Sequence, residues 1–188
     1  YIESLEASAT EKARLMKLIP AVHRSKTLAF VELVRRGEVR PRTGIRRFLG
    51  EARAAGLRLA IASTTSAENV EALLAGSLGP GISRWFDVIA TGDVVANKKP
   101  APDIYRLALS SLGVAPRNAV AIEDSQIGVQ AATAAGLVTI ATPTRWTAEQ
   151  DFAGAELVLR SLDDLDVEHL AALHGAALHR MENHAHTQ

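Results

Sequence analysis

The sequence of 188 residues contains no cysteine and carries no net charge, and each absence excludes a class of protein. Without cysteine there is no disulfide framework, no thiol nucleophile and no cysteine-ligated zinc. Lys and Arg together number 21, as do Asp and Glu, so no overall basic field favours binding to nucleic acid. No apolar run approaches the roughly 18 residues that span a bilayer, and the first residues lack the apolar core of a signal peptide. We therefore expect a soluble, cytoplasmic globular protein without nucleic-acid or membrane partners.

Helix-breaking residues divide the chain into a helical amino-terminal part and a longer remainder. Residues 3–18 and 22–36 are typical of amphipathic helices, the first ended by Pro20 and the second by Gly37. Residues 37–44 are rich in glycine and proline, which predicts a linker.

After this linker, apolar segments of strand length alternate with helical patterns. The predicted strands are 57–62, 87–90, 119–122, 137–141 and 156–159, and the predicted helices are 45–55, 68–75, 103–111 and 126–135. This alternation predicts the α/β class: a three-layer sandwich with a parallel sheet, which binds ligands beyond the carboxyl ends of its strands.

Polar side chains follow three of the predicted strands. They are the Ser63 to Ser66 cluster, the pair Lys98 and Lys99, and the pair Glu123 and Asp124. Hydroxyls and a lysine bind phosphoryl oxygens, and adjacent carboxylates hold Mg²⁺, so together they suggest phosphoryl transfer. Each has a simpler interpretation: Ser63, Ser66 and Asp124 or Ser125 as helix caps, and the lysines as solvated charges. The prediction depends on their occurring together.

Three motifs resemble those of the haloacid dehalogenase superfamily, in the same order. They are Ala62-Ser63, the run Lys99-Pro-Ala-Pro-Asp103, and the pattern Glu123-Asp-Ser-x-x-Gly128-x-x-Ala-Ala-x-x-Ala-Gly136. From His23 to Pro100 the chain is most similar to the CbbY-type sugar-phosphate phosphatases, a branch close to β-phosphoglucomutase. The resemblance implies a partial helical cap at 1–40, a Rossmann-like core at 41–165, and a carboxyl-terminal helix and tail at 166–188.

The resemblance also implies a role for each motif residue. Ser63 and the backbone N–H of Thr64 would bind the transferring phosphoryl group, and Lys99 would balance its charge, with Lys98 peripheral. Glu123 and Asp124 would position Mg²⁺, the expected cofactor.

In the cap, His23 and Lys26 are three residues apart on one helix face, so they would bind a second phosphate or sugar hydroxyls when the cap closes. The simpler interpretation is a solvated helix face. Residues 37–44 would then be the hinge between cap and core.

The superfamily's first motif, Asp-x-Asp followed by Gly and Thr or Val, does not occur in residues 1–188. The sequence Asp164-Leu-Asp166 has no glycine turn and leads into a helical pattern, so we reject it as the nucleophile. The resemblance places the missing strand between those ending at Ser63 and Glu123, where unpaired buried backbone groups would cost about 1 to 3 kcal/mol each. Because a sheet divided at its centre should not persist, we expect about 50 residues, including this strand and the first cap helices, to precede residue 1, which is Tyr rather than Met.

The resemblance implies a Mg²⁺-dependent phosphatase that acts through an aspartyl-phosphate. The CbbY branch implies xylulose 1,5-bisphosphate, an inhibitory by-product of Rubisco, and thus metabolite repair beside the Calvin cycle; the residues themselves do not select this sugar phosphate. Two alternatives stay open: a phosphomutase similar to β-phosphoglucomutase, and a catalytically silent phosphate-binding domain if the nucleophile is truly absent. We expect a monomer.

Overall fold

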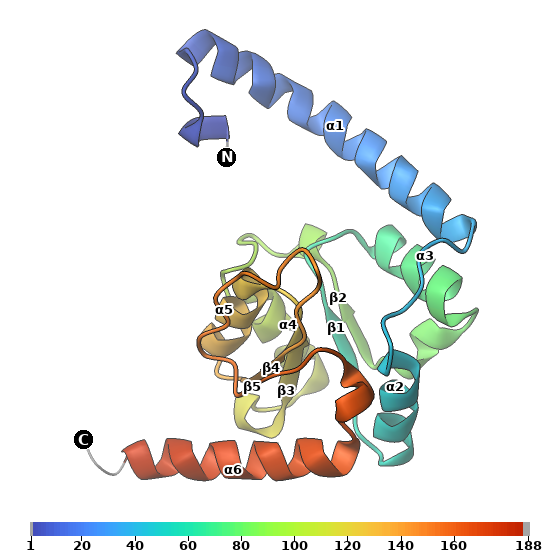
Figure 1. Ribbon diagram of the computed structural model, residues 1–188, viewed down its shortest axis with the longest axis vertical. Helices are drawn as coiled ribbons and strands as arrows, with labels where there is room; N and C mark the ends of the chain where they lie inside the picture. The colour runs from blue at the N-terminus through green and yellow to red at the C-terminus, as the bar shows by residue number, and fades with distance from the viewer. Residues whose placement is uncertain (1, 186–188) are drawn as a thin grey trace.

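A computed structural model of the chain describes residues 2–185 (Figure 1). Its α-helices are α1 (Ala9–Arg35), α2 (Ile45–Ala54), α3 (Ala67–Leu78), α4 (Asp103–Leu112), α5 (Gln126–Ala134) and α6 (Val167–Ala185). The strands are β1 (Ala60–Ala62), β2 (Val88–Ala90), β3 (Val120–Glu123), β4 (Val138–Ala141) and β5 (Leu157–Val158). Short 3₁₀ helices, η1 (Ile2–Ser4), η2 (Ile82–Trp85), η3 (Gly92–Val94), η4 (Pro116–Asn118) and η5 (Leu162–Asp164), lie between them.

Alternating side chains along the strands produce the three layers. Ile61 of β1 and Ile122 of β3 pack on the side covered by α2, α3 and α6. Their neighbours Ala62 and Ala121 point the other way and pack against α4 and α5. Successive side chains of a strand face opposite sides of the sheet, so these short apolar strands pack against helices on both faces. The predicted three-layer α/β arrangement with parallel strands is therefore present.

The strands form two separate parallel sheets rather than one. β1 pairs with β2, and β3 pairs with β4, which pairs with β5. Among residues 2–185, no strand pairs with the second edge of β1 or of β3. A cavity of about 650 Å³ is lined by every residue of β1 and of β3, together with mostly apolar side chains that include Phe48 and Tyr105. The cavity therefore lies along the two unpaired strand edges.

Helix α1 is continuous through Pro20, so the prediction of two helices separated at Pro20 is wrong. Proline removes one backbone donor, and the carbonyl left without it belongs to Met16. Because Met16 is about half exposed, water can satisfy that carbonyl and the helix continues.

The carboxyl-terminal end of α1 rests on α3. Val34 is 2% exposed, and a Cβ added at Gly76 of α3 would lie 2.3 Å from its Cγ1 atom, so glycine allows this close approach. The rest of α1 extends away from the core (Figure 1).

The chain ends in helix α6, as the pattern after Asp166 predicts. Asp166 begins the helix, since its carboxylate accepts a hydrogen bond of 2.7 Å from the backbone N–H of His169. The predicted tail, residues 186–188, lies outside the described residues, as does Tyr1. Within residues 2–185, no helix combines the length and apolar character needed to cross a membrane.

Candidate active site

Three of the predicted site residues meet at the carboxyl ends of the strands. Ser63 follows β1 directly and its backbone N–H donates to the Ala90 carbonyl of β2 at 3.0 Å. Glu123 is the last residue of β3, in register with Ala141 of β4. Lys99 comes from the loop before α4, and its Nζ donates to the Ala62 carbonyl oxygen at 3.1 Å and to the Glu123 carboxylate. The structure thus joins the three motifs in one site.

The loop after β1 holds the Ser63 hydroxyl in place. Its Oγ accepts a hydrogen bond of 3.3 Å from the backbone N–H of Thr65, which leaves the hydroxyl hydrogen free to donate to a ligand. The backbone N–H of Gly92 donates to the Thr65 carbonyl at 2.9 Å. A Cβ at Gly92 would lie 2.2 Å from the Thr64 carbonyl oxygen, so only glycine permits this approach. Thr64 itself is exposed.

Ser66 occupies the N-cap position of α3, yet its side chain makes no capping hydrogen bond. Ser66 is therefore the N-cap residue of α3 by position, but its hydroxyl does not cap the helix. Instead, the amide of Asn69, which is 6% exposed, donates from Nδ2 to the Thr65 hydroxyl at 3.0 Å and braces the loop from inside.

Tyr105 of α4 is a site residue that sequence reasoning missed. Its hydroxyl donates to the Glu123 carboxylate, and its ring centroid is 4.9 Å from Lys99 Nζ, within range of a cation–π interaction. Burial and the neighbouring Glu123 carboxylate raise the pKa of the Tyr105 hydroxyl, which therefore stays protonated as a donor. Its signal in the sequence was weak, because it matches the apolar side of a helix.

The two acidic residues differ in exposure. Glu123 is 8% exposed, and a Cβ at Gly128 would lie 1.9 Å from its Oε2, so the motif glycine makes room for this carboxylate. Asp124 is exposed, and the adjacent Ser125, at the N-cap of α5, makes no side-chain capping bond.

Mg²⁺ fits this donor set, because it prefers oxygen ligands and commonly binds through one or two carboxylates plus substrate phosphate. Among the described residues, no group of three or more histidine, aspartate or glutamate side chains is placed to hold a metal. Two carboxylates plus the oxygens of a bound phosphate and water are therefore the ligand set available.

The loop from Thr142 to Gln150 is fixed to the acidic motif, which the sequence did not reveal. The Thr147 hydroxyl donates to the Asp124 carbonyl at 2.6 Å, and the Gln150 side-chain oxygen accepts from the Gln126 N–H at 2.9 Å. Arg42 in the 37–44 linker donates to the Pro143 carbonyl at 2.9 Å. The predicted hinge is thus tied to a loop beside the site.

Two predicted residues lie apart from this cluster. His23 and Lys26 are exposed on α1, and no hydrogen bond or ion pair among the described residues links them to the site. Their predicted roles stay predictions. Lys98, which was predicted to be peripheral, is exposed, in contrast to Lys99.

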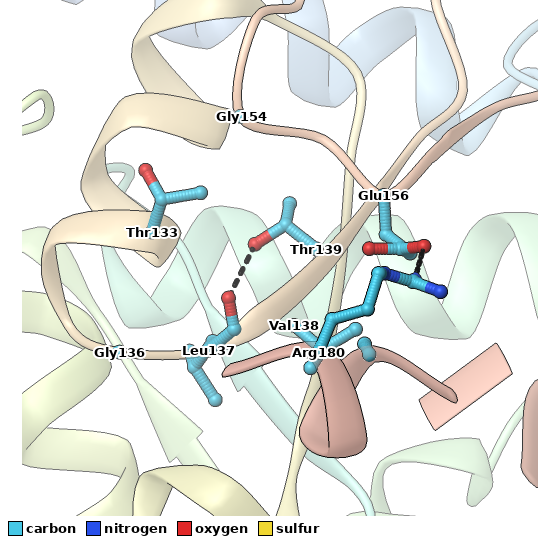
Figure 2. A pocket seen from close by; sticks show the side chains of 9 residues that line it. Thr133, Gly136, Leu137, Val138, Thr139, Gly154, Glu156 and Arg180 are labelled. Carbon is cyan, nitrogen blue, oxygen red and sulfur yellow. Dashed lines mark hydrogen bonds and ion pairs between the residues drawn. The ribbon is translucent and has the colours of Figure 1, made fainter. Parts of the chain in front are cut away.

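A second hollow, of about 590 Å³, is lined by none of Ser63, Lys99, Glu123 and Asp124, although Gly136 at the end of the third motif borders it (Figure 2). Thr133, Gly136, Thr139 and Gly154 line it, together with an ion pair between Glu156 and Arg180 of α6. The Thr133 and Thr139 hydroxyls donate to backbone carbonyls, so their hydrogens are not available to a ligand in this hollow.

Comparison with known proteins places these features in a family. Residues 5–136 match the haloacid dehalogenase-like hydrolase family. CbbY of Cereibacter sphaeroides is 51% identical over 147 residues, which are 78% of this chain and 64% of that protein. Plasmid-encoded CbbY of Cupriavidus necator is 42% identical over 164 residues, 87% of this chain and 65% of that protein. The chain therefore spans a little under two thirds of the length of these relatives.

Solved structures confirm the predicted fold class. A mutant CbbY from Rhodobacter sphaeroides in complex with xylulose 1,5-bisphosphate superposes with a TM-score of 0.74 at 51% identity, covering 78% of this chain and 65% of that one. A β-phosphoglucomutase from Clostridium difficile has a TM-score of 0.68 at 24% identity, covering 91% of this chain and 70% of that one, and shares the fold.

Proposed function

Because the chain belongs to the haloacid dehalogenase-like hydrolase family, we propose that it forms most of a Mg²⁺-dependent phosphatase for phosphorylated sugars. One observation carries the proposal: Lys99 lies between the Ala62 carbonyl and the Glu123 carboxylate, at the strand end where Ser63 begins its loop. A fixed cation beside a hydroxyl and carboxylates suits phosphoryl transfer, since that reaction depends on positioning and on stabilising charge.

Each residue has a role in this proposal. Ser63 donates its hydroxyl hydrogen to one phosphoryl oxygen, and the backbone N–H of Thr64 donates to another. The Lys99 ammonium offsets the negative charge shared by the phosphate and the nucleophile. Glu123 and Asp124 would hold Mg²⁺, which when bound withdraws charge from the phosphoryl oxygens.

The nucleophile of the proposed reaction is an aspartate carried outside residues 1–188, at the end of a strand seated between β1 and β3. Its carboxylate oxygen bonds to phosphorus as the bond from phosphorus to the sugar oxygen breaks, and a second aspartate protonates that sugar oxygen. Water then attacks phosphorus, which releases inorganic phosphate and restores the carboxylate. The cavity along the unpaired edges of β1 and β3 supports this placement, because Glu123 and Tyr105 are among the residues that line it.

For the substrate we propose xylulose 1,5-bisphosphate, the sugar bisphosphate held by the CbbY structure that is 51% identical to this chain. The reaction would remove an inhibitory by-product of Rubisco.

In the same proposal, residues 1–40 form part of a helical cap and residues 41–165 form the core. His23 and Lys26 are exposed on α1 and so accessible to the second phosphate or the sugar hydroxyls when the cap closes over the core.

Phosphate release from a panel of sugar mono- and bisphosphates, with and without Mg²⁺, tests the proposed function on protein whose amino terminus has been verified. We expect Mg²⁺-dependent release that is fastest with xylulose 1,5-bisphosphate. Label that passes from substrate to product sugar without free phosphate would indicate a phosphomutase instead. Phosphate binding without turnover of any substrate would indicate a silent phosphate-binding domain.

A further inference from the structure

The loop after β4 carries an exposed aromatic residue beside the proposed active site. Trp146 is 79% exposed, whereas large aromatic side chains are usually well buried. The guanidinium carbon of Arg145 lies 4.5 Å from the centroid of its ring. Arg145 is itself exposed, and no ion pair between it and a carboxylate is present among the side chains that the structure describes.

The position of this pair relative to the acidic motif is fixed by hydrogen bonds on both sides. Before it, the backbone N–H of Thr142 donates to the Glu123 carbonyl at 2.6 Å. After it, the Thr147 hydroxyl donates to the Asp124 carbonyl at 2.6 Å. The loop segment that carries Arg145 and Trp146 is therefore anchored on both sides to the backbone of the residues that would bind Mg²⁺.

The chemistry of the pair suits a polyhydroxylated, phosphorylated ligand. The guanidinium covers one face of the indole and leaves the other face for the C–H groups of a sugar. An unpaired guanidinium presents several donors in a planar fork that matches the oxygens of a phosphate group.

We propose that Arg145 and Trp146 form a subsite for the part of the substrate that is not cleaved, with Arg145 binding the second phosphate and Trp146 contacting the sugar carbons, which leaves the sugar hydroxyls to His23 and Lys26. The inference rests on the proposed function, since it assigns a subsite to the same reaction. It also explains why the loop is tied to the Asp124 backbone: the subsite must keep a constant distance from the phosphoryl group that reacts.

The test compares variants of the intact protein on two substrates, xylulose 1,5-bisphosphate and p-nitrophenyl phosphate, which has no second phosphate. We expect Arg145→Gln and Trp146→Ala each to raise KM for the bisphosphate about tenfold, the effect of one lost charge-assisted or aromatic contact, with KM for p-nitrophenyl phosphate unchanged. Trp146→Phe keeps an aromatic face and should restore most of the affinity.

A matched control is the second arginine–tryptophan pair of the chain. Arg53 lies 5.0 Å from the Trp85 ring at the amino ends of β1 and β2, the end opposite the site, so Arg53→Gln should change neither KM. The subsite is refuted if the bisphosphate KM of Arg145→Gln and Trp146→Ala stays at the wild-type value, or if both substrates are affected equally.

Binding measured without turnover separates this inference from the proposed function. With EDTA present, xylulose 1,5-bisphosphate should change the tryptophan fluorescence of the wild type and of Arg53→Gln, and inorganic phosphate should not. The change should vanish in Trp146→Phe, which retains Trp85. If no substrate is hydrolysed, the proposed function fails and this titration alone decides the subsite. If xylulose 1,5-bisphosphate bound Arg145→Gln as tightly as the wild type, the proposed subsite would be refuted.

Discussion

Lys98 and Lys99 are neighbours in the sequence but differ in burial and in contacts. Lys98 is exposed, while Lys99 reaches the Ala62 carbonyl at 3.1 Å and the Glu123 carboxylate. We expect Lys99→Ala to lower kcat/KM for phosphate release by at least about 10²-fold, because it removes the fixed positive charge from the site. Lys98→Ala should change kcat/KM less than about twofold, as for other exposed charges. Equal losses in the two variants would show that the assignment of the catalytic lysine is wrong.

Gly128 provides a test of how Glu123 is placed. A Cβ at this position would lie 1.9 Å from Glu123 Oε2, so Gly128→Ala must displace the carboxylate or the helix. We expect a loss of about 1 to 3 kcal/mol in the free energy of unfolding, measured in urea, together with weaker Mg²⁺ activation.

Gly50 is a matched control, since it also lies within a helix but has no atom within 4 Å of an added Cβ. Gly50→Ala should raise the free energy of unfolding by about 0.5 to 1 kcal/mol. If Gly128→Ala had a free energy of unfolding as high as that of Gly50→Ala, the Glu123 carboxylate would not lie against residue 128.

At the residue scale, the sequence predicted the groups that carry motif chemistry and missed those that brace them. Ser63, Lys99 and Glu123 each follow a predicted strand, so parallel pairing was enough to predict that they converge. Tyr105 and Asn69 matched helical patterns. Their hydrogen bonds to Glu123 and Thr65 depend on tertiary packing, which periodicity does not encode.

At the scale of elements, most helices and strands after residue 44 could be predicted, because their apolar periodicity agrees with burial in a layered core. The predicted strand at 57–62 shortens to Ala60–Ala62, since Leu57 remains 43% exposed before the strand begins. The sequence predicts a break at Pro20 because proline removes a backbone donor from a helix, yet α1 continues through it. An exposed helix can solvate the carbonyl that proline leaves unpaired.

Helix α6 offers a test of pH dependence at its first turn. The backbone N–H of His169 donates to Asp166 and lowers the pKa of that carboxyl below 3.8. Because the pKa of Asp166 is lower in the folded state, its ionised carboxylate stabilises the helix fully above pH 3.8. This stabilisation is lost as the pH falls through the pKa of Asp166 in the folded protein. We therefore expect the helical ellipticity of the wild type to fall below pH 3.8 more steeply than that of Asp166→Asn, which keeps the cap without titrating.

The control for this helix is Asp164→Asn, since Asp164 is exposed in η5, outside α6. Its acid transition should follow the wild type. If the acid transition of Asp166→Asn also followed that of the wild type, the ionised Asp166 carboxylate would not stabilise the start of α6.

At the scale of the whole molecule, the central feature is the division of the sheet. β1 and β3 each leave one edge without a strand partner among the described residues, and both edges line the same apolar cavity. Both strands end at the proposed active site, so one inserted parallel strand would complete the sheet and deliver its last side chain to Lys99. Fold and catalysis would then depend on the same segment.

The contribution of this segment to stability can be separated from its contribution to catalysis by adding residues to the amino terminus of 1–188. We expect an apolar strand ending in Asp-x-Asp, joined through a helical segment, to raise the melting temperature, since it satisfies unpaired backbone groups and fills the cavity. It should also confer Mg²⁺-dependent phosphate release. The same extension with Asn replacing the first aspartate should raise the melting temperature equally and confer no release, because an amide is not a nucleophile. An extension whose apolar residues are replaced by serine should do neither. A rise in melting temperature with this serine version would mean that the strand does not occupy the cavity between β1 and β3.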